Sequence, residues 1–135
     1  MDLSSAMTIA AAGMRAQSAR LQVTAENLAN AESTGLSAGD DPFRRRTVSF
    51  TERRDRATGA ELVGVSRYGL DASPFELRHE PGHPAADADG NVKYPNVNPL
   101  IELVDMREAQ RSYEANLNAM QLARSMIGRT LDLLR

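Results

Sequence analysis

The chain has 135 residues, no cysteine, no tryptophan and a formal net charge of −2, and these figures exclude several classes of protein. A chain of this length forms one domain with a modest core and leaves no room for a separate catalytic domain. The small negative charge argues against general attraction to nucleic acid or to anionic lipid. Without cysteine, disulfides, thiolate catalysis and cysteine-ligated metals are excluded. Aromatic residues make up only 4% of the chain, which favours a thin, elongated build over a compact core.

The first residues, "MDLSSAMTIAAAGMRAQSARLQ", do not have the basic start and leucine-rich run of a cleaved secretory signal peptide. No segment approaches the ~20 consecutive apolar residues that a membrane span needs. We therefore expect a soluble chain without membrane insertion; if it leaves the cell, we expect it to do so without a cleaved signal peptide.

The first predicted element is a helix from about Leu3 to Ala31, with Ser4 or Ser5 as its N-cap. Steps of four and three residues along it meet mostly apolar and small side chains, which is the pattern of a coiled-coil seam. Gly13 weakens a helix by up to ~1 kcal/mol relative to alanine, and a close helix–helix approach at this position would explain it. The large seam residues predicted to form an interface are Leu3, Met7, Met14, Leu21 and Leu28.

The end of this helix, "ENLANAESTG", carries Asn27 and Asn30 on adjacent turns. One interpretation is a fraying helix end, with Asn30 or Gly35 near the C-cap. The other is that the two amides hydrogen-bond backbone groups of the following loop or of a neighbouring chain and so fix the angle at which the chain leaves the helix. The chemistry of the residues does not decide between them.

The middle of the chain, residues 33–97, is predicted to be a small β-rich insert. Short strands are expected within Arg44–Phe50 and Ala60–Leu70, separated by turns rich in proline, glycine and aspartate. Six arginines between Arg44 and Arg56 form the only local basic cluster. Because Phe50 is its only aromatic residue and no nucleic-acid motif accompanies it, we expect a solvated or partner-facing strand surface that includes Arg44, Arg45 and Arg46.

The only two histidines, His79 and His83, have the four-residue spacing of zinc ligands on a helix. Pro81 stands between them and rules out that helix, so a solvated loop is favoured over a metal site completed by Asp87 and Asp89. No glycine-rich phosphate loop, nucleophile elbow or catalytic triad is present. The sequence therefore predicts no enzyme activity, no cofactor and no metal.

The last predicted element is a helix that begins at Asn98 and Pro99 and runs nearly to the final residue. Asn98 supplies the cap and Pro99 presets the first turn, while Glu102 and Asp105 place negative charge near the positive end of the helix dipole. The same stepping by four and three gives a second seam. Its apolar members are Leu103, Met106, Tyr113, Leu117, Met120, Ile127, Leu131 and Leu134.

These elements predict a mainly α fold with a small β insert, divided into residues 1–32, 33–97 and 98–135. The two terminal helices are expected to pair as a coiled-coil-like hairpin, because two seams in one chain most simply meet each other. Further apolar positions, among them Val23 and Leu122, would stay in water in such a hairpin. Helices from neighbouring chains are therefore expected to cover them.

Leu21–Gly35 resembles the signature of the bacterial flagellar axial rod and hook proteins, Ala-Asn-x-Ala-Asn-x-x-Thr-x-Gly. Glu26 stands where alanine is usual, and no aromatic residue follows the glycine directly. Residues 80–134 and the stretch "DPFRRRTVSF" resemble the proximal rod proteins of the same family, and only about residues 66–77 are left unmatched. The residues on or near the signature positions are Asn27, Ala29, Asn30, Thr34 and Gly35.

This resemblance implies a structural subunit of the flagellar basal-body rod. The terminal helices would pack into the core tube of a helical assembly that crosses the periplasm and transmits torque from motor to hook, with the insert outside. The implied partners are other copies of the chain, the rod subunits FlgB, FlgF and FlgG, a FliE-like adaptor and the flagellar type III export apparatus. The asparagine pair would fix the turn at which the chain leaves the tube wall.

A competing hypothesis is a monomeric helical hairpin that binds a ligand through its β insert, using the cluster between Arg44 and Arg56. Such a binding module would be a stable monomer at every concentration, whereas a rod subunit would gain structure from its neighbours.

Overall fold

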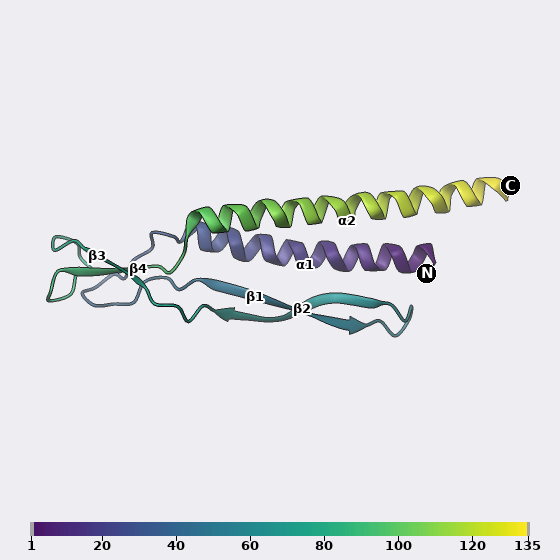
Figure 1. The fold of residues 1–135 in the computed structure, drawn as a ribbon. Coiled ribbons are helices and arrows are strands. Elements are labelled where there is room, and N and C mark those ends of the chain that lie inside the picture. The colour runs from purple at the N-terminus through teal and green to yellow at the C-terminus, as the bar shows by residue number, and fades with distance from the viewer. Residues whose placement is uncertain (1, 135) are drawn as a thin grey trace. The chain divides into compact units, whose positions relative to one another are not determined.

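The computed structural model describes residues 2–134, in which the chain begins and ends with a long helix and has four strands between the two in sequence (Figure 1). The chain is therefore mainly α with a small antiparallel β region, as the sequence predicts. The elements are α1 (Leu3–Ala29), β1 (Arg46–Arg54), β2 (Glu61–Leu70), β3 (Glu76–His79), β4 (Asn91–Tyr94) and α2 (Pro99–Leu133).

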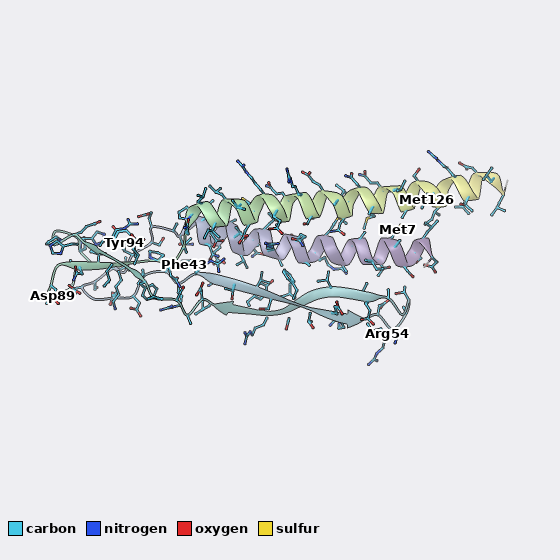
Figure 2. The ribbon with its side chains drawn as sticks, viewed as in Figure 1. Met7, Phe43, Arg54, Asp89, Tyr94 and Met126 are labelled. Carbon is cyan, nitrogen blue, oxygen red and sulfur yellow. The ribbon has the colours of Figure 1, made fainter. Side chains whose placement is uncertain are left out.

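The strands form two separate two-stranded sheets, β1 with β2 and β3 with β4. The first pair confirms the predicted strands, and β1 runs to Arg54, four residues beyond the expected end (Figure 2). The second pair is not predicted by the sequence, because each strand has only four residues among proline and glycine turns. Its strands are antiparallel, with Glu76 opposite Tyr94, and they carry a small core of Ala85, Val92 and Tyr94.

The predicted N-cap of the first helix is wrong by two or three residues, because the cap is Asp2 rather than Ser4 or Ser5. Oδ1 of Asp2 accepts a hydrogen bond of 2.6 Å from the backbone N–H of Ser5. This bond lowers the pKa of the Asp2 carboxyl, since the charged form is the one that accepts it. A carboxylate at the positive end of the helix dipole is a better partner there than a serine hydroxyl.

The predicted start of the last helix is confirmed. Oδ1 of Asn98 accepts from the N–H of Leu100 at 3.1 Å and from that of Ile101 at 3.5 Å, and the helix begins at Pro99. It continues to Leu133, close to the predicted end.

The chain divides into two compact units, each built from segments that are distant in sequence. Unit 1 comprises Met1–Leu21, Val48–Arg67 and Arg107–Arg135, and unit 2 comprises Gln22–Thr47 and Tyr68–Met106. The division into residues 1–32, 33–97 and 98–135 follows chain order instead, and it stays a prediction.

In unit 1, α1 and α2 come close at Gly13. A Cβ at this position would lie 2.6 Å from Oδ1 of Asn116, so only glycine fits without displacing that side chain. Arg20 and Glu108 form an ion pair between the same two helices at 3.4 Å, which is exposed and contributes little stability. The close approach predicted from the glycine is confirmed.

The buried positions of α2 differ from its predicted seam by one residue. Glu102, Ala109 and Ala123 are buried, and each immediately precedes a position of the four-and-three stepping, namely Leu103, Gln110 and Arg124. One residue corresponds to a rotation of about 100° around a helix, so Leu103 points away from the buried face, whereas other seam residues lie closer to it. Of the predicted interface residues, those on α1 and Met106, Met120 and Ile127 are half-buried, whereas the exposed ones are Leu103, Tyr113, Leu117, Leu131 and Leu134.

Replacing Gly13 by alanine is expected to lower the melting temperature of the chain, because the added Cβ collides with Asn116, whose Nδ2 is held by the carbonyl of Ser112. Gly128 in α2 has open space around it, so Gly128→Ala should instead raise stability by up to ~1 kcal/mol through helix propensity. Thermal unfolding followed by circular dichroism measures both changes.

The double variant Gly13→Ala with Asn116→Ala removes the obstructing side chain and should recover the loss. If Gly13→Ala stabilises the chain as much as Gly128→Ala does, the helices do not approach closely at this position.

Candidate functional site

Asn27 lies at the centre of the candidate site, where α1 meets the start of β1 within unit 2. Its side chain is 1% exposed. Its Nδ2 donates to the carbonyl of Arg46 at 2.9 Å, and its Oδ1 accepts from the N–H of Arg46 at 2.8 Å. The amide therefore pairs with both backbone groups of one residue, as a neighbouring strand would. Of the two interpretations of Asn27, the structure supports the bond to the following segment.

Glu102 is the second buried polar residue of the site, also 1% exposed. Its Oε1 accepts from Nε of Arg45 at 2.5 Å, and its Oε2 accepts from Nδ2 of Asn27 at 3.3 Å. Both carboxylate oxygens thus have a donor, which is the condition for burying this charge at tolerable cost. The first turn of α2 is held in this way to α1 and to β1.

The guanidinium of Arg45 faces three carboxylates in unit 2. Besides Glu102, it lies 3.5 Å from Asp71 and 4.0 Å from Asp105. Burial alone would lower the pKa of Arg45, but the hydrogen bond and charge of Glu102, assisted by the two aspartates, raise it above its ordinary value. The arginine is therefore a permanent cation, and it supplies the counter-charge for the buried glutamate.

The turn Asp71–Phe75, which the sequence left unassigned, is fixed to the same place by Arg44 and Asn96. Nη1 of Arg44 donates to the carbonyls of Asp71 and Ser73, and its guanidinium stacks 4.1 Å from the ring centre of Phe75. The Nδ2 of Asn96 donates to the same two carbonyls, and its Oδ1 accepts from the N–H of Arg45.

Three consecutive arginines thus engage three different segments of unit 2. Arg44 holds the turn after β2, Arg45 holds the first turn of α2, and Arg46 forms an ion pair of 3.1 Å with Glu26 on α1. The expectation of a free basic surface is wrong for Arg44 and Arg45, which are half-buried and engaged. For Arg46, whose side chain is 53% exposed, it stays a prediction.

The remaining residues of the predicted turn shape the end of α1. Nδ2 of Asn30 donates to the carbonyl of Glu26 at 2.9 Å, and its Oδ1 accepts from the hydroxyl of Ser33. A Cβ on Gly35 would lie 2.5 Å from Cβ of Asp40, so close packing requires glycine there. Thr34 is half-buried and Ala29 is exposed. Asn27 therefore binds the next segment, while Asn30 closes its own helix.

The histidines and loop carboxylates lie outside this site, in and around the β3–β4 hairpin. Nδ1 of His83 accepts from the N–H of Ala85, while Oδ1 of Asp87 accepts from the N–H groups of Asp89 and Asn91. These side chains stabilise the turns between the two strands, where Figure 2 labels Asp89. Within residues 2–134, no group of three or more histidine or acidic side chains could hold a metal ion.

Neither described helix has a stretch long and apolar enough to cross a membrane.

Known proteins with similar sequences identify the family. The sequence model of the family described as "Flagellar basal body rod FlgEFG protein C-terminal" matches residues 88–133. The flagellar basal-body rod protein FlgC of Agrobacterium fabrum is 50% identical over 133 residues, which cover 98% of this chain and 96% of that protein. The FlgC proteins of Salmonella typhimurium and Bacillus subtilis are 42% and 33% identical, over 98% and 94% of this chain and 98% and 95% of theirs.

The chain belongs to the FlgC family of flagellar basal-body rod proteins. This confirms the resemblance found in the sequence.

Sequence analysis of this FlgC family member missed several residues of the site. The sequence predicts a surface position for Arg45 and only a helix-dipole role for Glu102, and it does not mark Asp71 or Asn96 as site residues. One pattern in the sequence could have indicated burial of Glu102: it directly precedes the seam residue Leu103 and therefore lies beside the seam on the helix surface. For Asp71 and Asn96 no periodicity marks a contact, since both lie outside helices and strands.

Arg45→Met is expected to destabilise unit 2 by about 3 kcal/mol, because it leaves the carboxylate of Glu102 buried without its counter-charge. The double variant Arg45→Met with Glu102→Met replaces both charges by apolar groups and should recover most of that loss. Chemical denaturation compares the two variants with the native chain. A double variant less stable than Arg45→Met alone would contradict the role assigned to Arg45.

Asp71 gives a test by pH. The hydroxyl and N–H of Ser73, with the more distant Arg45, lower the pKa of its carboxyl. Since the folded pKa lies below the unfolded value of about 3.9, this contribution to stability is complete above pH ~4 and is lost as pH falls through the folded pKa. Ser73→Ala removes the hydroxyl donor but keeps the N–H, so it should raise the pKa of Asp71 in a carboxyl ¹³C NMR titration, and an unchanged value would exclude the Ser73 hydroxyl as the main cause.

Proposed function

We propose that this chain is a structural subunit of the proximal flagellar rod, which polymerises through its terminal helices and transmits torque without any chemistry. One observation carries the proposal: α2 exposes a series of large apolar side chains that the chain itself does not cover. They are Leu100, Ile101, Leu103, Val104, Tyr113, Leu117, Leu122, Met126, Leu131, Leu133 and Leu134. Exposed apolar residues in such number mark a surface that binds other protein.

We also propose that α1 and α2 pair as a coiled-coil-like hairpin. The contacts of Gly13 with Asn116 and of Arg20 with Glu108 within unit 1 support this pairing. Small residues such as Ala109 and Ala123 face inward and permit a close approach. In this arrangement the exposed members of the predicted seam of α2, such as Leu103 and Leu117, are available to other subunits.

The exposed residues of α2 lie along two flanks of the helix rather than one. At about 100° per residue, Val104, Leu122 and Met126 fall on one flank, and Tyr113, Leu117 and Leu131 fall on the other, with the buried positions between them. One partner helix covers one flank. Two flanks therefore call for two neighbouring helices, as in the wall of a helical tube and unlike a simple dimer.

The partners proposed on family resemblance are further copies of the chain, the rod subunits FlgB, FlgF and FlgG, and a FliE-like adaptor. On the same resemblance, the proposal puts the subunit in the part of the basal body that crosses the periplasm and has it exported by the flagellar type III apparatus. A chain whose helices gain most of their burial from neighbours suits that route, because it is incompletely folded before assembly.

The alternative, a monomeric module that binds a ligand through the insert, is not favoured. Its basic cluster would have to bind the ligand, yet Arg44 and Arg45 are already committed to contacts within unit 2.

Leu117→Asp and Ile127→Asp are each expected to abolish swimming when they replace the native chain in a flagellated cell, because a charge on the helix surface blocks burial against a neighbour. Leu117 is exposed in the free subunit, so the Leu117→Asp variant should still fold. The matched control is Ser125→Asp. Ser125 is exposed and lies on the side of α2 opposite the buried positions, so cells with this variant should swim normally.

Swimming is measured in soft agar and subunit levels by immunoblot. Normal swimming in both variants would refute assembly through this helix.

A further inference from the structure

The two units carry opposite net charge. Unit 1 has eleven arginines and seven acidic side chains, a formal charge of +4, whereas unit 2 has four arginines, one lysine and eleven acidic side chains, a formal charge of −6. The near-neutral total of −2 hides this division. Opposite charges on two parts of one subunit attract the unlike parts of two copies to each other.

The cations of the two units also differ in their partners. In unit 2, every lysine and arginine has one: Arg44 stacks on Phe75 and bonds carbonyls, and the others form ion pairs, namely Arg45, Arg46, Arg78 and Lys93. Among the described arginines of unit 1, Arg20 has a partner in Glu108, but Arg15 and Arg53 have none. The positive charge of unit 1 is therefore left for an external partner.

Arg15 and Arg53 line the same groove, between α1 and the β1–β2 ribbon of unit 1. Its volume is about 280 Å³. The other lining residues are apolar or small: Ala12, Ala16, Leu62, Val63, Gly64 and Val65. A groove with an apolar floor and two unpaired cations fits an apolar side chain that is accompanied by carboxylates.

Unit 2 presents such a group in the loop after α1. Leu36 is 91% exposed, more than any other large apolar side chain among the described residues. Asp40 and Asp41 follow in the same loop, and only Lys93 counters them. The loop is ordered by its own bonds, since the N–H of Ser37 donates to Oδ2 of Asp40 and the N–H of Asp40 donates to the carbonyl of Ser37. An ordered loop loses little entropy on binding.

We propose that Leu36 of one copy of this chain docks into the Arg15–Arg53 groove of a second copy, with Asp40 and Asp41 facing the two arginines. The contact joins unlike surfaces, so it repeats from copy to copy without closing and builds a helical row. This inference rests on the proposed function and adds to it a contact made outside the helix seams, with a named partner and a dependence on salt.

The first test is self-association of the purified full chain by sedimentation equilibrium in 20 mM, 150 mM and 1 M NaCl. Association should weaken as salt rises, because charges at the rim of an interface are screened. Leu36→Ser and Arg53→Glu should each weaken it about tenfold or more, as for central residues of an interface.

Two matched controls should associate like the wild type. Leu77→Ser removes another exposed leucine, 62% accessible, elsewhere on unit 2. Arg67→Glu makes the same charge change on unit 1 outside the groove, so it separates contact in the groove from general attraction.

The second test uses the absence of native cysteine. A tagged Leu36→Cys chain mixed with an untagged Val65→Cys chain should form a disulfide between copies under mild oxidation, whereas a Ser125→Cys partner should not. A chain carrying both Leu36→Cys and Val65→Cys that forms its disulfide internally at every dilution would show its own loop filling the groove and overturn the inference.

A wild-type chain that stays monomeric at all concentrations and salts also overturns it, as does association that is indifferent to both Leu36→Ser and Arg53→Glu. In the last case the docking contact fails while polymerisation stands, since the effect of Leu117→Asp on swimming tests the helix surface independently.

Discussion

The pairing of the Asn27 amide with the backbone of Arg46 is the constraint on which the rest of unit 2 depends. A helix uses its own N–H and C=O groups internally, so its side has no backbone groups left to pair with a strand. The carboxamide of asparagine reproduces one peptide unit, with a donor and an acceptor side by side. Alanine supplies neither group, and aspartate supplies only acceptors. An asparagine that is unneeded for helix stability is therefore needed to join α1 to β1.

Around this pair, buried charge sets geometry more than it sets stability. Glu102 is shared between Arg45 and Asn27, so the first turn of α2 is joined to β1 and to α1 through one carboxylate. Replacing such a buried pair with apolar residues is often neutral for stability, because desolvation offsets most of the attraction. The pair fixes the relative orientation of the two side chains, since a 2.5 Å hydrogen bond from a planar guanidinium is favourable in few orientations. The segments that connect insert and helices are thereby set at defined angles.

The sequence predicts the positions of the helices and strands well but predicts poorly which side of each helix is buried, for one physical reason. Periodicity and capping located α1 and α2 to within a few residues, and β-branched runs located β1 and β2. The seam of α2 was nevertheless assigned to its large side chains, whereas the chain buries Ala109 and Ala123. A heptad pattern reports that a face will be covered but not which chain covers it. The β3–β4 hairpin and the contacts of Asp71 depend on short segments outside the long helices, which have no helical period.

This arrangement of small residues inside and large residues outside has an energetic consequence. Burying a leucine or valine side chain contributes about 1.5–3 kcal/mol, while an alanine contributes far less. Most of the buried apolar residues of the subunit are alanines, so burial within the chain contributes modestly to its stability. Leu117, Leu122 and Leu131 remain exposed to solvent. Most of the available hydrophobic free energy would therefore be released only if neighbouring helices covered α2, as proposed above. A subunit built in this way would gain more stability from its assembly than from its own core.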